Sequence, residues 1–100
     1  MTLVHVAFQE GFENDAVVLR LNGAEVFRQA GLTTKNQIGY ADSFETDVPP
    51  GPVRLEVDIA SRGTNGSQML HANGPTYVGV SLDRERRPTF HVSLEPFGYL

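Results

Sequence analysis

The sequence predicts an all-β fold: a single-domain antiparallel β-sandwich of about eight short strands. Three observations support this class. Apolar and polar residues alternate in several short runs, turn residues recur about every 8–12 positions, and no long segment has a helical period. A chain of 100 residues has the length of one domain, spanning 1–100. The pattern is compatible with a jelly-roll and with an immunoglobulin-like strand order.

The clearest local signal is Asn22-Gly23, which lies between strand-like runs at 16–21 and 24–28. This dipeptide favours a type I′ turn, which requires positive φ at both central residues. The turn predicts a register that pairs Leu21 with Ala24, Arg20 with Glu25, Leu19 with Val26 and Val18 with Phe27. Val18 and Phe27 then form an apolar pair on the outer face. We expect the aromatic C-terminal tail (residues 96–100) or a partner protein to cover that pair.

The other strands follow from the same period of two residues. Residues 53–59 place four aliphatic side chains on one face and three charges on the other, and 3–8 also alternate. Further strands are expected at 37–41, 44–48, 68–72, 76–83 and 89–95. In the last hairpin, core-facing Val92 and Leu94 require Leu82 opposite Phe90, with 84–88 as the loop.

Composition excludes several function classes. The net charge of −4 argues against a nucleic-acid or anionic-membrane surface, and the arginines at 84–87 are interpreted as a solvated loop. The chain has no cysteine, which excludes disulfides and thiolate catalysis. No apolar run approaches the length of a membrane-spanning helix. We expect a cytoplasmic protein, or a module whose leader has been removed.

Candidate catalytic and metal-binding residues are few. His5, His71 and His91 are of the type that binds zinc or iron, but a His-x-His pattern with a downstream carboxylate is missing. Ser81 and His91 are expected to lie opposite each other, near Asp83. A flat sheet face supplies no oxyanion hole, so a cross-strand pair on a wet face is favoured over a catalytic triad. We therefore predict no catalytic residues, no cofactor and no metal ligands.

Acidic residues gather in two stretches, at 10–15 and 42–47. Loops of this kind bind calcium through carboxylate and carbonyl oxygens. The ordered spacing of a calcium loop is missing here, so solvated acids are the favoured interpretation.

Residues 16–59 resemble accessory β-sandwich modules. The resemblance rests on the Asn22-Gly23 hairpin and on the Pro-Gly turn that enters the alternating strand in 48–57 (Val-Pro-Pro-Gly-Pro-Val-Arg-Leu-Glu-Val). Jelly-roll domains of the galactose-binding type show such a hairpin and turn, and transthyretin-like modules share the Pro-Gly entry. The resemblance implies architecture only, and no ligand-binding residue carries over.

Three functions follow from these observations. The first is a non-catalytic binding or assembly module that contacts a protein partner or a second copy of the chain. Its interface residues are Val18, Phe27, Phe97, Tyr99 and Leu100. The second is carbohydrate or small-ligand binding by the polar loops at 9–15, 29–36 and 61–67. Its candidate ligand-binding residues are Asn14, Asn36, Asn65, Tyr40 and Tyr77. The third, and least supported, is a metal-dependent enzyme that uses the histidines.

Overall fold

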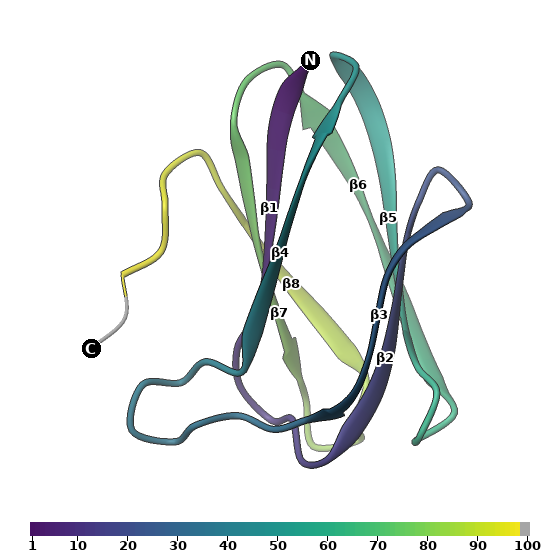
Figure 1. Cartoon of the computed structure of the whole chain (residues 1–100), viewed down its shortest axis with the longest axis vertical. Coiled ribbons are helices and arrows are strands. Elements are labelled where there is room, and N and C mark those ends of the chain that lie inside the picture. Colours follow the sequence, from purple (N-terminus) through teal and green to yellow (C-terminus); the bar gives the residue numbers. More distant parts are fainter. Residues whose placement is uncertain (99–100) are drawn as a thin grey trace.

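The structure is a computed structural model that describes residues 1–98, and these residues form an all-β fold of two four-stranded sheets packed together (Figure 1). The all-β class predicted from the alternating runs is therefore confirmed. The strands are β1 (Thr2–Phe8), β2 (Asp15–Leu21), β3 (Ala24–Leu32), β4 (Asp42–Val48), β5 (Gly51–Ile59), β6 (Thr64–Ala72), β7 (Thr76–Leu82) and β8 (Pro88–Ser93). Within the described residues, no helix is long and apolar enough to cross a membrane.

The strand order is β4-β1-β7-β8 in one sheet and β3-β2-β5-β6 in the other. Five of the six strand pairs are antiparallel, but β1 runs parallel to β7, with Val4 beside Thr76 and Phe8 beside Val80. The expectation of a purely antiparallel sandwich is wrong at this pair. Parallel neighbours need a long connection, and here the connection includes five other strands, so no local pattern announces the pairing.

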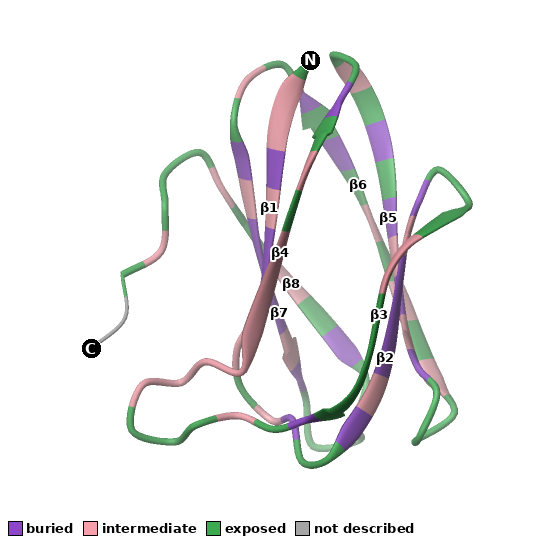
Figure 2. Ribbon diagram, in the orientation of Figure 1, coloured by how far each residue is buried: buried purple, intermediate pink, exposed green. Residues whose placement is uncertain are grey.

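The core lies between the two sheets and includes the residues of β1 and β5 that alternation assigned to it. Val4, Val6 and Phe8 of β1 are fully buried, and the four aliphatic residues of β5 are at most 2% exposed. Their charged neighbours on β5 face outward, so buried positions alternate with exposed or half-buried ones along this strand (Figure 2). The prediction that the strand at 53–59 has one buried face and one solvent-facing face is confirmed.

The β2–β3 hairpin begins as predicted and then departs from the expected register. Asn22 and Gly23 have φ of 51° and 84°, and Leu21 and Ala24 are paired. A register shift between Leu19 and Arg20 then places Phe27, in place of Val26, opposite Leu19. The predicted pairing of Val18 with Phe27 is therefore wrong. An extra residue in one strand turns every later side chain to the other face.

The shift carries Phe27 into the interior. Its ring stacks on Phe8 with centroids 5.5 Å apart and contacts Phe44 at 5.3 Å. Val18 is only 5% exposed, and in the sheet it lies between Arg28 of β3 and Asp58 of β5. The two residues do not form the exposed apolar pair that the sequence predicted, so this hairpin face is not an apolar contact surface.

The expected cover for that pair is also elsewhere. Phe97 packs on the ring of His91, with centroids 5.9 Å apart, and His91 belongs to β8 in the other sheet. Figure 1 shows the segment from the end of β8 to residue 98 on the side of the molecule away from β2 and β3. The prediction that the tail covers the hairpin is wrong for Phe97. Tyr99 and Leu100 lie outside the described residues.

In the β7–β8 hairpin the predicted residues share each face of the sheet, but the pairing is shifted by two residues from the predicted register. Val80, and not Leu82, pairs with Phe90, while Leu82 pairs with Pro88. The side chain of Asp83 causes the tighter turn, because its Oδ1 accepts hydrogen bonds from the N–H groups of Glu85 and Arg87.

Two predicted core residues near the end of β8 are exposed. Val92 is 43% exposed and Leu94 is 77% exposed, although both have the parity of the core. β8 is the edge strand of its sheet, so its far end has no neighbouring strand on one side. The segment at 37–41 also differs from the prediction, because it is a turn with a single bridge between Lys35 and Tyr40.

Candidate functional site

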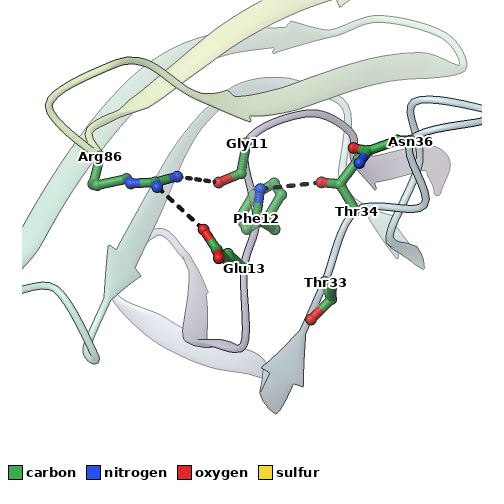
Figure 3. A pocket seen from close by; sticks show the side chains of 7 residues that line it. All are labelled: Gly11, Phe12, Glu13, Thr33, Thr34, Asn36 and Arg86. Atoms are coloured by element: carbon green, nitrogen blue, oxygen red, sulfur yellow. Dashed lines mark hydrogen bonds and ion pairs between the residues drawn. The ribbon is translucent and has the colours of Figure 1, made fainter.

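The connections at one end of the sandwich border an open hollow of about 390 Å³ (Figure 3). It is formed by the β1–β2 loop, the start of the β3–β4 connection and the β7–β8 loop. Figure 1 shows these connections together at the lower end of the molecule. The lining residues are Gly11, Phe12, Glu13, Thr33, Thr34, Asn36 and Arg86.

Thr34 ties the β1–β2 loop to the β3–β4 connection. Its hydroxyl accepts the N–H of Phe12 at 3.0 Å and donates to the carbonyl of Gln9 at 2.6 Å. The backbone of Thr34 also donates to the carbonyl of Phe12 at 2.9 Å. Phe12 is 3% exposed, and its ring meets Phe8 edge-on at 5.7 Å. These bonds hold one wall of the hollow in place before any ligand arrives.

Arg86 closes the hollow from the β7–β8 loop. Its backbone has a φ of 63°, and its guanidinium donates to the carbonyl of Gly11 at 2.8 Å and to the Glu13 carboxylate at 3.3 Å. Figure 3 shows both contacts along the rim of the hollow. A guanidinium has five N–H donors, so donors remain for a bound molecule.

Gly11 allows the loop to pass close to β7. Its φ is 89°, a conformation that L side chains rarely adopt. A Cβ atom at this position would lie 2.6 Å from the backbone carbonyl oxygen of Leu82. The glycine therefore brings the wall of the hollow into contact with β7.

The buried carboxylate of Asp15 links the β1–β2 loop to the β5–β6 turn. It accepts the Arg62 Nε–H at 2.8 Å, the Ser61 hydroxyl at 3.0 Å and the Glu13 N–H at 2.8 Å. Burial alone raises the pKa of Asp15. The hydrogen bonds from Glu13, Arg62 and Ser61, together with the Arg62 charge, outweigh burial and hold this pKa below its ordinary value.

The structure brings some of the predicted ligand-binding residues together. Asn36 lines the hollow, and the N–H of Asn14 donates to the Thr33 hydroxyl beside it. Tyr40 belongs to the same β3–β4 connection, where it bridges to Lys35. Asn65 is exposed on β6 and Tyr77 lies on the outer face of the other sheet, so neither reaches the hollow.

Four of the lining side chains are not among the predicted ligand-binding residues: Glu13, Thr33, Thr34 and Arg86. The arginine cluster at 84–87 was the available signal for Arg86, but it was interpreted as a solvated loop tip. Its partners are about 75 residues earlier in the chain, since Arg86 and Gly11 are separated by that distance. No sequence motif indicates that two loops so far apart in the chain lie together in the fold.

The histidines and the serine do not assemble into a reactive centre. His5 bonds to Glu45 at 2.6 Å, and Ser81 pairs with Thr89 rather than with His91. The predicted pairing of Ser81 with His91 is therefore wrong. The Asp83 carboxylate accepts hydrogen bonds within the β7–β8 turn. In residues 1–98 no group of three or more His, Asp or Glu side chains is placed to hold a metal ion.

Comparison of the chain with protein-family models, with curated protein sequences and with solved structures returned no match.

Proposed function

We propose that this protein is a binding module that takes a small, hydroxyl-rich ligand, of the carbohydrate class, into the hollow at the loop end of the sandwich. One observation carries the proposal. Side chains of three chemical kinds, the Glu13 carboxylate, the Asn36 amide and the Arg86 guanidinium, converge on one hollow from three separate loops.

The chemistry of these groups supports a hydroxyl-rich ligand. A sugar hydroxyl both donates and accepts hydrogen bonds. It therefore fits a site in which a carboxylate accepts, a guanidinium donates and an amide does both. The walls are already bonded to each other through Thr34 and Arg86, and Asp15 holds the backbone of Glu13, which lowers the ordering cost of binding. Since Phe12 is buried and cannot stack on a ligand, we expect weak affinity, with Kd of about 1 mM, or about −4 kcal/mol.

The test is an NMR titration of the ¹⁵N-labelled protein with a panel of mono- and oligosaccharides. Saturable amide shifts in 9–14, 33–36 and 85–87 are expected for at least one sugar. Asn36→Ala removes an exposed lining amide and should weaken this binding several-fold. Asn65→Ala, the same change on exposed β6, should leave it unaltered. The proposal is contradicted if no sugar in the panel causes saturable shifts, or if the shifts lie only outside these three segments.

The proposal includes the resemblance to accessory β-sandwich modules, and the two packed sheets support it. Jelly-roll and immunoglobulin-like strand orders remain its two alternatives. A contact through Val18 and Phe27 is not retained, because Val18 is buried and Phe27 is partly buried against the core. The cytoplasmic location stays a prediction.

A further inference from the structure

The four edge strands of the sandwich differ sharply in charge. β3 and β4 carry Asp, Glu and Arg side chains, whereas β6 and β8 contain no Asp, Glu, Lys or Arg. Charged side chains on an edge strand discourage pairing with another chain. One side of the sandwich is therefore protected against strand pairing in this way and the other is not.

The exposed apolar residues lie on the unprotected side. Apart from Met1, the large exposed apolar side chains of the described residues are Met69 on β6, Val92 on β8 and Leu94 just after β8. An uncharged edge and exposed apolar side chains thus coincide on β8 and the residues that follow it.

The backbone of β8 offers hydrogen-bonding groups at this edge. Asp83 and Arg87 are joined by a backbone hydrogen bond across the turn. In an antiparallel ladder the bonded positions alternate, so Thr89, His91 and Ser93 point their N–H and C=O groups toward β7. Phe90 and Val92 then point theirs to the free edge.

The two ends of β8 differ in how open this edge is. Pro88 has an outward position at which its missing N–H costs nothing, and β6 approaches it, since a Cβ on Gly66 would lie 3.2 Å from the Pro88 carbonyl oxygen. The exposure of Val92 and Leu94 shows that the other end is uncovered. The most open part of this edge is therefore 92–94, while the ring of Phe90 lies against Gly66 of β6.

We propose that two copies of this chain associate by antiparallel pairing of β8 with β8 about a two-fold axis at Val92. This register pairs Val92 with its own copy, Phe90 with Leu94 and His91 with Ser93. Apolar residues then meet on one face and polar residues on the other. The outward-pointing backbone groups of Phe90 and Val92 become the bonded positions of the new ladder, which joins the two β4-β1-β7-β8 sheets into one.

Segment 90–94 matches its own image about Val92, apolar against apolar, and the lack of charge on β8 permits a second copy at this edge. Each chain carries a net charge of −4, so two copies repel over most approaches. The β8 edge has no charged side chain to oppose its own image. The contact is short, so the dimer should be weak and should depend on concentration.

The test is the mass of the full chain by sedimentation equilibrium over a wide range of concentration. The wild type should shift from monomer to dimer as concentration rises. Val92→Lys places like charges on the axis and should weaken dimerisation at least tenfold. Val92→Pro removes one outward N–H and should do the same. The matched control, Gln29→Lys, adds the same charge to exposed β3 and should dimerise like the wild type.

A second measurement does not depend on the mass of the variants. The chain has no cysteine, so Val92→Cys introduces a single thiol. A short thiol crosslinker should join two Val92→Cys chains, and should leave Gln29→Cys chains unlinked. Thermal melts confirm that each variant is folded. A wild type that stays monomeric at every concentration overturns the proposal. So do a dimer that survives Val92→Lys and a monomer that takes up only a strand of another protein.

Discussion

The carboxylate of Asp15 supports the loop end of the sandwich, and replacing it with Asn tests that role. Asp15 is fully buried, and three donors meet it: Arg62, Ser61 and the N–H of Glu13. In Asp15→Asn the amide keeps the size of the carboxylate but loses its charge. One oxygen becomes an NH₂ group, so at least one donor faces another donor.

The magnitude follows from burial. Breaking a fully buried ion pair costs about 3–5 kcal/mol. The Arg62 side chain is 36% exposed, so water screens part of that interaction. We therefore expect the free energy of unfolding to fall by about 2–3 kcal/mol at neutral pH. That loss is a large share of the stability of a domain of this size, about 5–15 kcal/mol.

The effect should depend on pH in a defined direction. The folded-state pKa of Asp15 lies below its ordinary value of 3.8, so the carboxylate stabilises the fold fully above that value. This contribution is lost as pH falls through the folded-state pKa. The difference between wild type and Asp15→Asn should accordingly be complete at neutral pH and should shrink in acid below about pH 4.

The assay is urea denaturation followed by circular dichroism at a series of pH values. Asp47→Asn, at an exposed position on β4, is the matched control and should change stability by less than about 0.5 kcal/mol. Equal stability of Asp15→Asn and wild type at neutral pH would refute the reasoning. A difference that grew on acidification would refute it equally.

Two further predictions concern the same denaturation assay. Gly11→Ala should destabilise the fold by about 3 kcal/mol, because it combines strain at positive φ with a clash against the Leu82 carbonyl. A loss below about 1 kcal/mol would show that the loop relaxes freely. Phe27→Ala should cost about 2–3 kcal/mol, less than a fully buried Phe, since its ring is only partly buried between two others. A neutral Phe27→Ala variant would contradict the interior position of that ring.

Local patterns predicted the strands well where one face is buried and the other is wet. The alternation in β1 and β5 identified their core residues correctly, because a strand of period two has only two faces. The Asn22-Gly23 turn was predicted for a similar reason. Its positive φ values depend on the two residues themselves, and the structure shows them.

Pairings and exposure were harder to predict, and the errors have definite causes. The register shift in β2–β3 moved Phe27 to the core, and the Asp83 turn shortened the β7–β8 loop. In both hairpins one or two residues changed every later pair. Val92 and Leu94 have the parity of core residues but lie at a sheet edge, and parity alone does not show which strand is outermost.

The candidate site was predicted only in part for a related reason. The sequence indicated polar loops at 9–15 and 29–36, and Asn36 among them, because loop residues are recognisable from composition. The partnership of Arg86 with Gly11 and Glu13 depends on which loops share an end of the sandwich. That arrangement follows from strand order.

The sequence by itself determined the all-β class, the main strands, the faces of β1 and β5 and the type of the first turn. Each of these depends on residues within one strand or one turn of each other. The tertiary structure alone decided the parallel pairing of β1 with β7, the hollow at the loop end and the open edge of β8. These features join segments tens of residues apart. Long-range packing selects them by burying apolar area between two sheets, which no local period specifies.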